Sequence, residues 1–232
     1  MNNSKETDPD DRQPTAMAEL ASDPSSRKRF LAMVGGAGAA SAFGIFLAAC
    51  GDDDGGNTTS TQSQPARQSG TSQFGQGDLG ILNYALTLEY LEADFYSKAA
   101  ASGLLRGKVL DVAKQFGDHE EEHVAALKAT VEQLGGTPAK KPKTTFPLED
   151  QDSILSLAAT VENLGAAAYL GQADKIQDKK VLAAALSIHT VEARHAAVLN
   201  SVIGKDVTPE GSFAKPASAS KVLASVKSFI VS

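Results

Sequence analysis

Apolar residues recur at three- and four-residue spacing along most of the chain after residue 78. In the first such stretch they are Leu82, Ala85, Leu88, Leu91 and Phe95, a pattern that repeats with the turn of an α-helix. The same periodicity, interrupted by glycines and prolines, predicts four long helices and a short terminal one. They are expected over residues 79–101, 108–134, 151–176, 179–203 and 219–231. The chain is therefore predicted to be all-α.

The connections between these helices predict how they pack. Short turns join the first helix to the second and the third to the fourth, so each pair should form an antiparallel hairpin. The middle connection, residues 137–150, contains three prolines and cannot be helical throughout. In extended form it spans on the order of 45 Å, the length of a bundle. The prediction is a four-helix bundle over residues 78–204, followed by a C-terminal extension over residues 205–232.

The chain before Cys50 has the composition of an export signal. Residues 1–25 are polar and acidic, which predicts disorder. A basic group follows, and then a weakly apolar run over residues 32–49 that ends in small residues. The basic group contains Arg27, Lys28 and Arg29. We predict a signal peptide over residues 1–49; an uncleaved anchor is the alternative, since a run of this length can just span a bilayer.

Residues 51–77 form a polar linker. They are rich in Gly, Ser, Thr and Gln, and a flexible coil of this length reaches roughly 25–30 Å. We therefore predict a tether over residues 50–77. Cys50 is the only cysteine, so a disulfide framework and a cysteine-rich metal site are excluded. The formal net charge of −6, with no dense basic patch, argues against nucleic acid as a partner.

The two predicted hairpins carry the same pattern of acidic and histidine residues. Each has a glutamate on its first helix and Glu-x-x-His on its second, at offsets of 73 and 72 residues between the halves. The shared residues are Glu89, Glu120 and His123 in the first hairpin and Glu162, Glu192 and His195 in the second.

These residues are predicted to meet in the middle of the bundle. Helical residues three apart share a face, so each Glu-x-x-His projects its two side chains together. All four glutamates lie about 23 Å from the turn of their own hairpin and can share one layer. Four buried carboxylates repel one another, and two bound cations remove that cost. Carboxylate and imidazole ligands suit iron or manganese. Surface charges are the alternative, and the repetition in both hairpins argues against it.

The bundle resembles the ferritin-like superfamily. It is most similar to the exported ferritin-like family that includes desiccation-related proteins, and residues 82–96, LNYALTLEYLEADFY, are the most typical stretch. The resemblance implies two iron ions, with manganese or a mixed iron and manganese pair as alternatives. It also implies that Glu120 and Glu192 bridge the metals, that Glu89 and His123 complete one site, and that Glu162 and His195 complete the other.

Other residues lie near these candidate ligands. Glu92 shares the face of the first-helix glutamate and is interpreted as a residue beside the metals, an alternate ligand or a charge at the edge of the core. Tyr96 and Tyr169 occupy matching positions and are candidates for residues beside the metal ligands. Packing also explains them, and a redox role stays open. His119 and His189 are expected to be structural, with metal ligation as the alternative.

The N-terminal segment resembles a twin-arginine export signal with a lipoprotein cleavage box. Lys28 stands where the second arginine of that pattern normally lies, so the general secretion route is the alternative. The resemblance implies that Cys50 becomes the lipidated first residue of the mature protein. The expected partners are then the export machinery and the membrane. The expected location is the outer face of the cytoplasmic membrane, with an oligomer neither required nor excluded.

Two classes of function follow from the resemblance. One is a diiron oxidoreductase, either a ferroxidase or an enzyme that removes peroxide and protects against oxidative stress. Peroxide removal needs an electron supply, and the chain has no CxxC module to provide one. The other class is a non-enzymatic stress or desiccation-related envelope protein whose metals are structural. Both interpretations stay open at this point.

Overall fold

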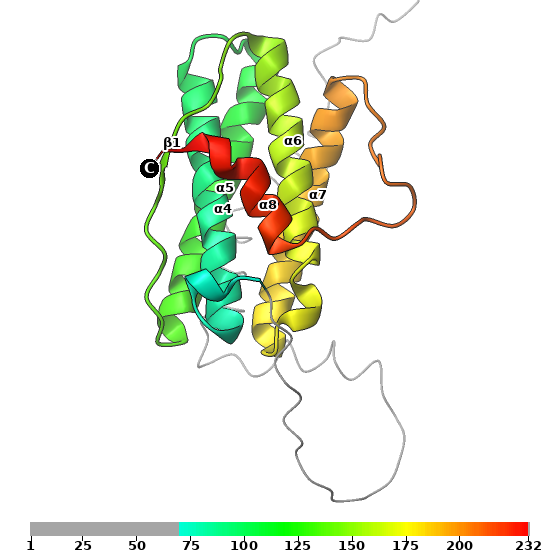
Figure 1. Cartoon of the computed structure of the whole chain (residues 1–232). Helices are drawn as coiled ribbons and strands as arrows, with labels where there is room; N and C mark the ends of the chain where they lie inside the picture. Colours follow the sequence, from blue (N-terminus) through cyan, green and yellow to red (C-terminus); the bar gives the residue numbers. More distant parts are fainter. Residues whose placement is uncertain (1–69, 232) are drawn as a thin grey trace, which may run out of the picture.

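The computed structural model describes residues 70–231, in which four long helices stand side by side (Figure 1). They are α4 (Gly77–Ala101), α5 (Gly107–Gln133), α6 (Gln151–Leu170) and α7 (Lys179–Val202). The predicted all-α bundle is confirmed, as are the two hairpins, α4 with α5 and α6 with α7. The crossover between α5 and α6 runs along the whole bundle (Figure 1). The predicted signal peptide, Cys50 and most of the linker lie outside the described residues.

Local signals in the sequence set the helix ends. Gly103 and Gly107 have φ of 74° and 56°, which favours glycine, and they flank the tight turn from α4 to α5. The side chain of Asp150 accepts a hydrogen bond from the backbone of Ser153 and caps α6. Asp178 caps α7 in the same way, through the first backbone N–H groups of that helix.

The third helix ends earlier than the periodicity predicts. α6 stops at Leu170, and a short 3-10 helix, η2 (Ala173–Lys175), replaces the expected last turn. Gly171 follows the last residue of α6, and the C-terminal extension docks at the same point: the backbone N–H of Ala217 donates to the carbonyl oxygen of Ala167 at 2.9 Å. A Cβ on Gly171 would overlap the carbonyl of Ala217, so the chain passes very close at this point.

The C-terminal extension differs from the single helix predicted over residues 219–231. α8 (Ala219–Val226) is followed by the 3-10 helix η3 (Lys227–Phe229) and the strand β2 (Ile230–Val231). β2 pairs antiparallel with β1 (Lys143–Thr144) in the crossover. Two-residue strands carry no alternating pattern, so periodicity could not predict them. The pairing fastens the C-terminus to the outside of the bundle.

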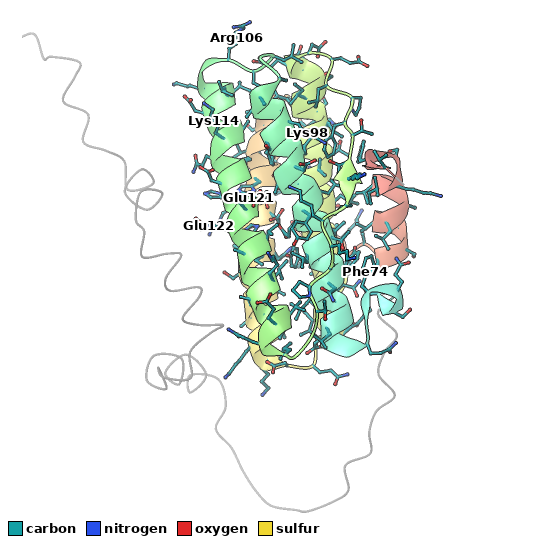
Figure 2. The ribbon with its side chains drawn as sticks, turned by 90° about the vertical axis from the view of Figure 1, so that its left-hand side faces the viewer. Phe74, Lys98, Arg106, Lys114, Glu121 and Glu122 are labelled. Carbon is teal, nitrogen blue, oxygen red and sulfur yellow. The ribbon has the colours of Figure 1, made fainter. Side chains whose placement is uncertain are left out.

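The described part of the chain begins before residue 78, at residue 70. A 3-10 helix, η1 (Ser72–Phe74), precedes α4, and Figure 2 labels Phe74 at its end. The Phe74 ring lies 5.8 Å from the Tyr84 ring. Asn83 donates a side-chain hydrogen bond to the carbonyl oxygen of Phe74. The last residues of the predicted linker therefore pack against the bundle.

The core has apolar clusters at both ends of the bundle and another beneath α8. One end contains Leu86 and Val131, the other contains Phe95 and Leu199, and Val222 on the inner face of α8 belongs to the third. Between the two end clusters lies a layer of buried acidic side chains.

Candidate metal centre

All four long helices contribute to a buried polar layer. Its members are Glu89 from α4, Glu120 and His123 from α5, Glu162 from α6, and Glu192 and His195 from α7. The four glutamates are 0% exposed. The side chain of His123 is 12% exposed and that of His195 is 4% exposed. The structure thus brings together all six residues singled out from the sequence.

These residues form two overlapping groups, each of which could hold a metal ion. In each group one ligand atom per residue lies within 4.8 Å of the others. Glu120 and Glu192 belong to both groups. One group is completed by Glu89 and His123 and the other by Glu162 and His195.

In the first group the Nδ1 atom of His123 faces three carboxylates. It lies 2.9 Å from Glu120 Oε2, 3.1 Å from Glu192 Oε1 and 3.2 Å from Glu89 Oε2. The two residues between Glu120 and His123, Glu121 and Glu122, lie on the outer side of α5 (Figure 2). The three-residue spacing therefore turns both candidate ligands inward.

In the second group the Nδ1 atom of His195 likewise faces carboxylates. It lies 3.1 Å from Glu120 Oε1 and 3.3 Å from Glu162 Oε2. These three atoms are nevertheless buried without a hydrogen-bond partner, as are both carboxylate oxygens of Glu192. Buried polar atoms are normally paired, so donor atoms that converge without pairing fit a bound cation.

Burial dominates the electrostatics of this layer. It raises the pKa of Glu192 well above its ordinary value, and the charge of Glu120 adds to the effect. Burial also raises the pKa of Glu89 to about 7, against the attraction of His123. For Glu120 burial acts in the same direction, but the imidazoles of His123 and His195 hold its pKa below the ordinary value. Four ionised carboxylates would carry more negative charge than two imidazoles can neutralise, so in the absence of a cation burial favours the protonated forms.

Two tyrosines hold the outer carboxylate oxygens from across the bundle. The hydroxyl of Tyr96 on α4 donates to Glu162 Oε1, and that of Tyr169 on α6 donates to Glu89 Oε1, both at 2.5 Å. Each bond leaves Oε2 of the same glutamate facing a histidine. Each tyrosine therefore orients a candidate ligand of the opposite hairpin, which agrees with the prediction that these residues lie beside the metal ligands.

Glu92 is a further buried carboxylate beside the cluster. It is 2% exposed, which overturns its interpretation as a charge at the edge of the core. Burial raises its pKa well above the ordinary value, and Glu192 is the next cause. Gly165, at the matching position of the other half, makes room for it: a Cβ there would lie 2.7 Å from Glu92 Oε1 and 3.1 Å from Glu192 Oε2.

His119 contributes more than its expected structural role. Its Nδ1 atom lies 2.9 Å from Nε2 of His195, the nitrogen that faces away from the cluster. Contacts of this kind orient a metal-binding imidazole. The spacing of residues along the sequence could not predict this contact, because His195 lies on a different helix from His119. His189 keeps to expectation, with its Nδ1 atom 3.0 Å from the backbone oxygen of Ala166.

Comparison with known proteins agrees with this geometry. Residues 77–205, more than half of the chain, match the family model described as a ferritin-like domain. No curated protein matches the chain.

Proposed function

This chain belongs to the ferritin-like domain family, and from that premise we propose that it is an extracytoplasmic diiron protein that acts as a ferroxidase. The observation that carries the proposal is the sharing of Glu120 and Glu192 by two groups of ligand atoms. Two shared carboxylates, with one glutamate and one histidine reserved for each ion, are what a bridged pair of metals needs. The four carboxylates also carry the charge that two divalent ions neutralise.

The donor atoms favour iron or manganese. Oxygen and imidazole nitrogen suit both metals, and the bundle contains no thiolate. Iron bound there would supply the redox chemistry, in which Fe(II) is oxidised to Fe(III) while oxygen or peroxide is reduced. A manganese or mixed pair would fit the same residues.

The protein's own part in this chemistry is to hold and shield the ligands. Tyr96 and Tyr169 fix the outer oxygens of the two unshared glutamates, which would leave the other oxygen of each carboxylate to bind an ion. The apolar clusters above and below keep bulk water away from the layer. Removal of peroxide is the second oxidative activity that suits the same residues.

The N-terminal sequence supports an extracytoplasmic, lipid-tethered location. A basic group, an apolar run and small residues precede Cys50, and a polar linker follows it. If Cys50 bears the lipid, the wild-type chain should incorporate a labelled fatty acid when expressed in a host that processes lipoproteins, and the variant Cys50→Ala should not. A wild-type chain that stays in the membrane without incorporating the label would instead support an uncleaved anchor.

A non-enzymatic role is the second candidate, and the buried charge favours it. Because all four helices contribute ligands, bound metal would hold the bundle together whether or not it reacts. A stress or desiccation-related envelope protein with structural metals would show the same cluster.

Metal analysis and oxygen uptake separate these candidates. The purified protein should contain about two iron ions per chain, absorb in the near ultraviolet and consume oxygen when Fe(II) is added. Glu120→Ala should lose metal and activity, whereas Glu121→Ala, which changes the exposed neighbour, should retain both. Bound zinc, with no oxygen uptake after loading with Fe(II), would establish the structural role.

A further inference from the structure

A cavity of about 120 Å³ lies at the end of the bundle where α4 turns into α5. Arg106 marks this end in Figure 2. All four long helices line the cavity, with Ala99 and Ala158 among its buried walls and Val202, which is 54% exposed, at its mouth. Apart from one lysine and one tyrosine, the lining residues are apolar.

The inner end of the cavity adjoins the candidate metal centre. Tyr96 lines it, and the hydroxyl of this residue donates to Glu162. Phe116 also lines it and stacks on the ring of His195, with 3.8 Å between the ring centroids. A molecule in the cavity would therefore touch both side chains that support the second group of ligands.

The opposite end of the bundle has a cavity that is related to this one by the internal repeat. At the offsets of 73 and 72 residues, several lining residues of the two cavities correspond. The pairs are Tyr96 with Tyr169, Ala158 with Ala85, Ala113 with Ala185, and Leu199 with Leu127. The second cavity has a volume of only about 20 Å³. Comparing the aligned lining residues therefore shows which differences make the first cavity larger.

One aligned position explains much of the difference in volume. Ala99 in the large cavity corresponds to Gln172 in the small one. Gln172 is 2% exposed and lines the small cavity, where its longer side chain occupies the space that Ala99 leaves open in the large one. Neither polar atom of its amide has a hydrogen-bond partner. An apolar void lowers stability, and an occupant would recover that loss.

The size and charge of the cavity indicate the kind of occupant. An engineered apolar cavity of about 150 Å³ in another protein binds benzene, so this one suits a single ring or a short alkyl chain. Lys108 is the only charged residue among those that line it. This lysine is exposed and forms no ion pair within residues 70–231. We propose that the cavity binds a small organic carboxylate, with its apolar part against Ala99 and Ala158 and its carboxylate at Lys108.

The test is calorimetric titration of the full, metal-loaded chain with benzoate, benzyl alcohol and benzylamine. Benzoate should bind most tightly. Ala99→Gln places the side chain of the other repeat in the cavity and should weaken benzoate by about tenfold or more, because a filled site cannot admit a second group. Ala101→Gln adds the same side chain at an exposed position and should bind like the wild type. Ala113→Val, a smaller change, should weaken binding partially if the first variant folds poorly.

The role of the lysine has its own matched control. Lys108→Gln should weaken benzoate about two- to fivefold, the range of one exposed ion pair, and leave benzyl alcohol unchanged. Lys180→Gln, at the corresponding position on α7, should affect neither ligand. The proposal is overturned if benzoate does not saturate the wild type, if Ala99→Gln and Ala113→Val both bind it unchanged, or if benzylamine binds as tightly. None of these results depends on whether the metals oxidise iron.

Discussion

Replacing either cluster tyrosine by phenylalanine is expected to weaken one metal ion and largely spare the other. Tyr96 and Tyr169 each donate to one unshared glutamate, Glu162 and Glu89 respectively. Without the hydroxyl, a fully buried carboxylate oxygen loses its partner and the glutamate loses its fixed orientation. Tyr96→Phe should therefore act at the ion held by Glu162, and Tyr169→Phe at the ion held by Glu89.

The size of the effect follows from the kind of hydrogen bond. A bond to a charged group contributes about 1.5–3 kcal/mol, and each 1.4 kcal/mol corresponds to about tenfold in affinity. We therefore expect the affinity for the affected ion to fall roughly ten- to a hundredfold. The range agrees with the usual cost of removing a residue that orients a metal ligand, about 10–100-fold.

Tyr84 provides the matched control. It is 1% exposed, and its hydroxyl is buried without a hydrogen-bond partner. Tyr84→Phe removes the same atom from the same bundle without breaking a bond, and it should leave metal affinity unchanged. The assay is anaerobic titration of metal-free protein with Fe(II) against a chromophoric chelator. An equal loss at both ions in Tyr96→Phe, or a loss no larger than in Tyr84→Phe, would refute the reasoning.

Three further predictions concern burial and orientation. The metal-free protein should lose stability as pH rises from 5 to 8, because the pKa of Glu89 is raised to about 7 in the folded state and the unfolded state releases its proton earlier. The lowered pKa of Glu120 acts oppositely, but only below its ordinary value of 4.5 and outside this window. Thermal unfolding with and without metal checks the pH dependence, and equal slopes of melting temperature against pH in the two forms would contradict it. Glu92→Gln should stabilise the metal-free protein at pH 8 by about 1–3 kcal/mol, since burial opposes ionisation of Glu92 in the folded state while the unfolded state ionises freely, and an amide has no such cost. Denaturant unfolding measures this change in stability, and an unchanged midpoint would count against it. His119→Leu should weaken metal binding about tenfold or more, while His189→Leu, which changes a contact with the backbone, should not; chelator competition compares the two, and equal losses would argue against an orienting role.

The fold was predictable because helical signals are local. Periodicity gave the four long helices, and the length of residues 137–150 gave the crossover. The features that the sequence did not predict depend on contacts between residues far apart in the chain. α6 ends at Leu170, before Gly171, where Ala217 docks on its last turn; apolar periodicity continued past this glycine, and it carries no information about a contact with a residue so far along the chain. The pairing of β1 with β2 is likewise a contact between residues far apart in the chain.

Only those residues of the candidate site that recur in both hairpins could be predicted from the sequence. Glu120 and His123 recur as Glu192 and His195, and this duplication located the cluster. His119 has Val191 at the matching position, so the repeat gave no indication of its contact. The hydrogen bonds of the tyrosines cross from one hairpin to the other, and an alignment of two halves cannot show which residues of one half face the other.

The differences between the halves are as informative as the matches. The six candidate ligands are duplicated, but their surroundings are not. His119 contacts His195 and has no counterpart beside His123, and the larger cavity reaches Phe116, against the same His195 ring. Both features therefore lie on the side of Glu162 and His195. Because an imidazole contact and an adjacent apolar space each change the basicity and the access of a ligand, the two halves of the centre are not interchangeable, although the sequence that builds them is repeated.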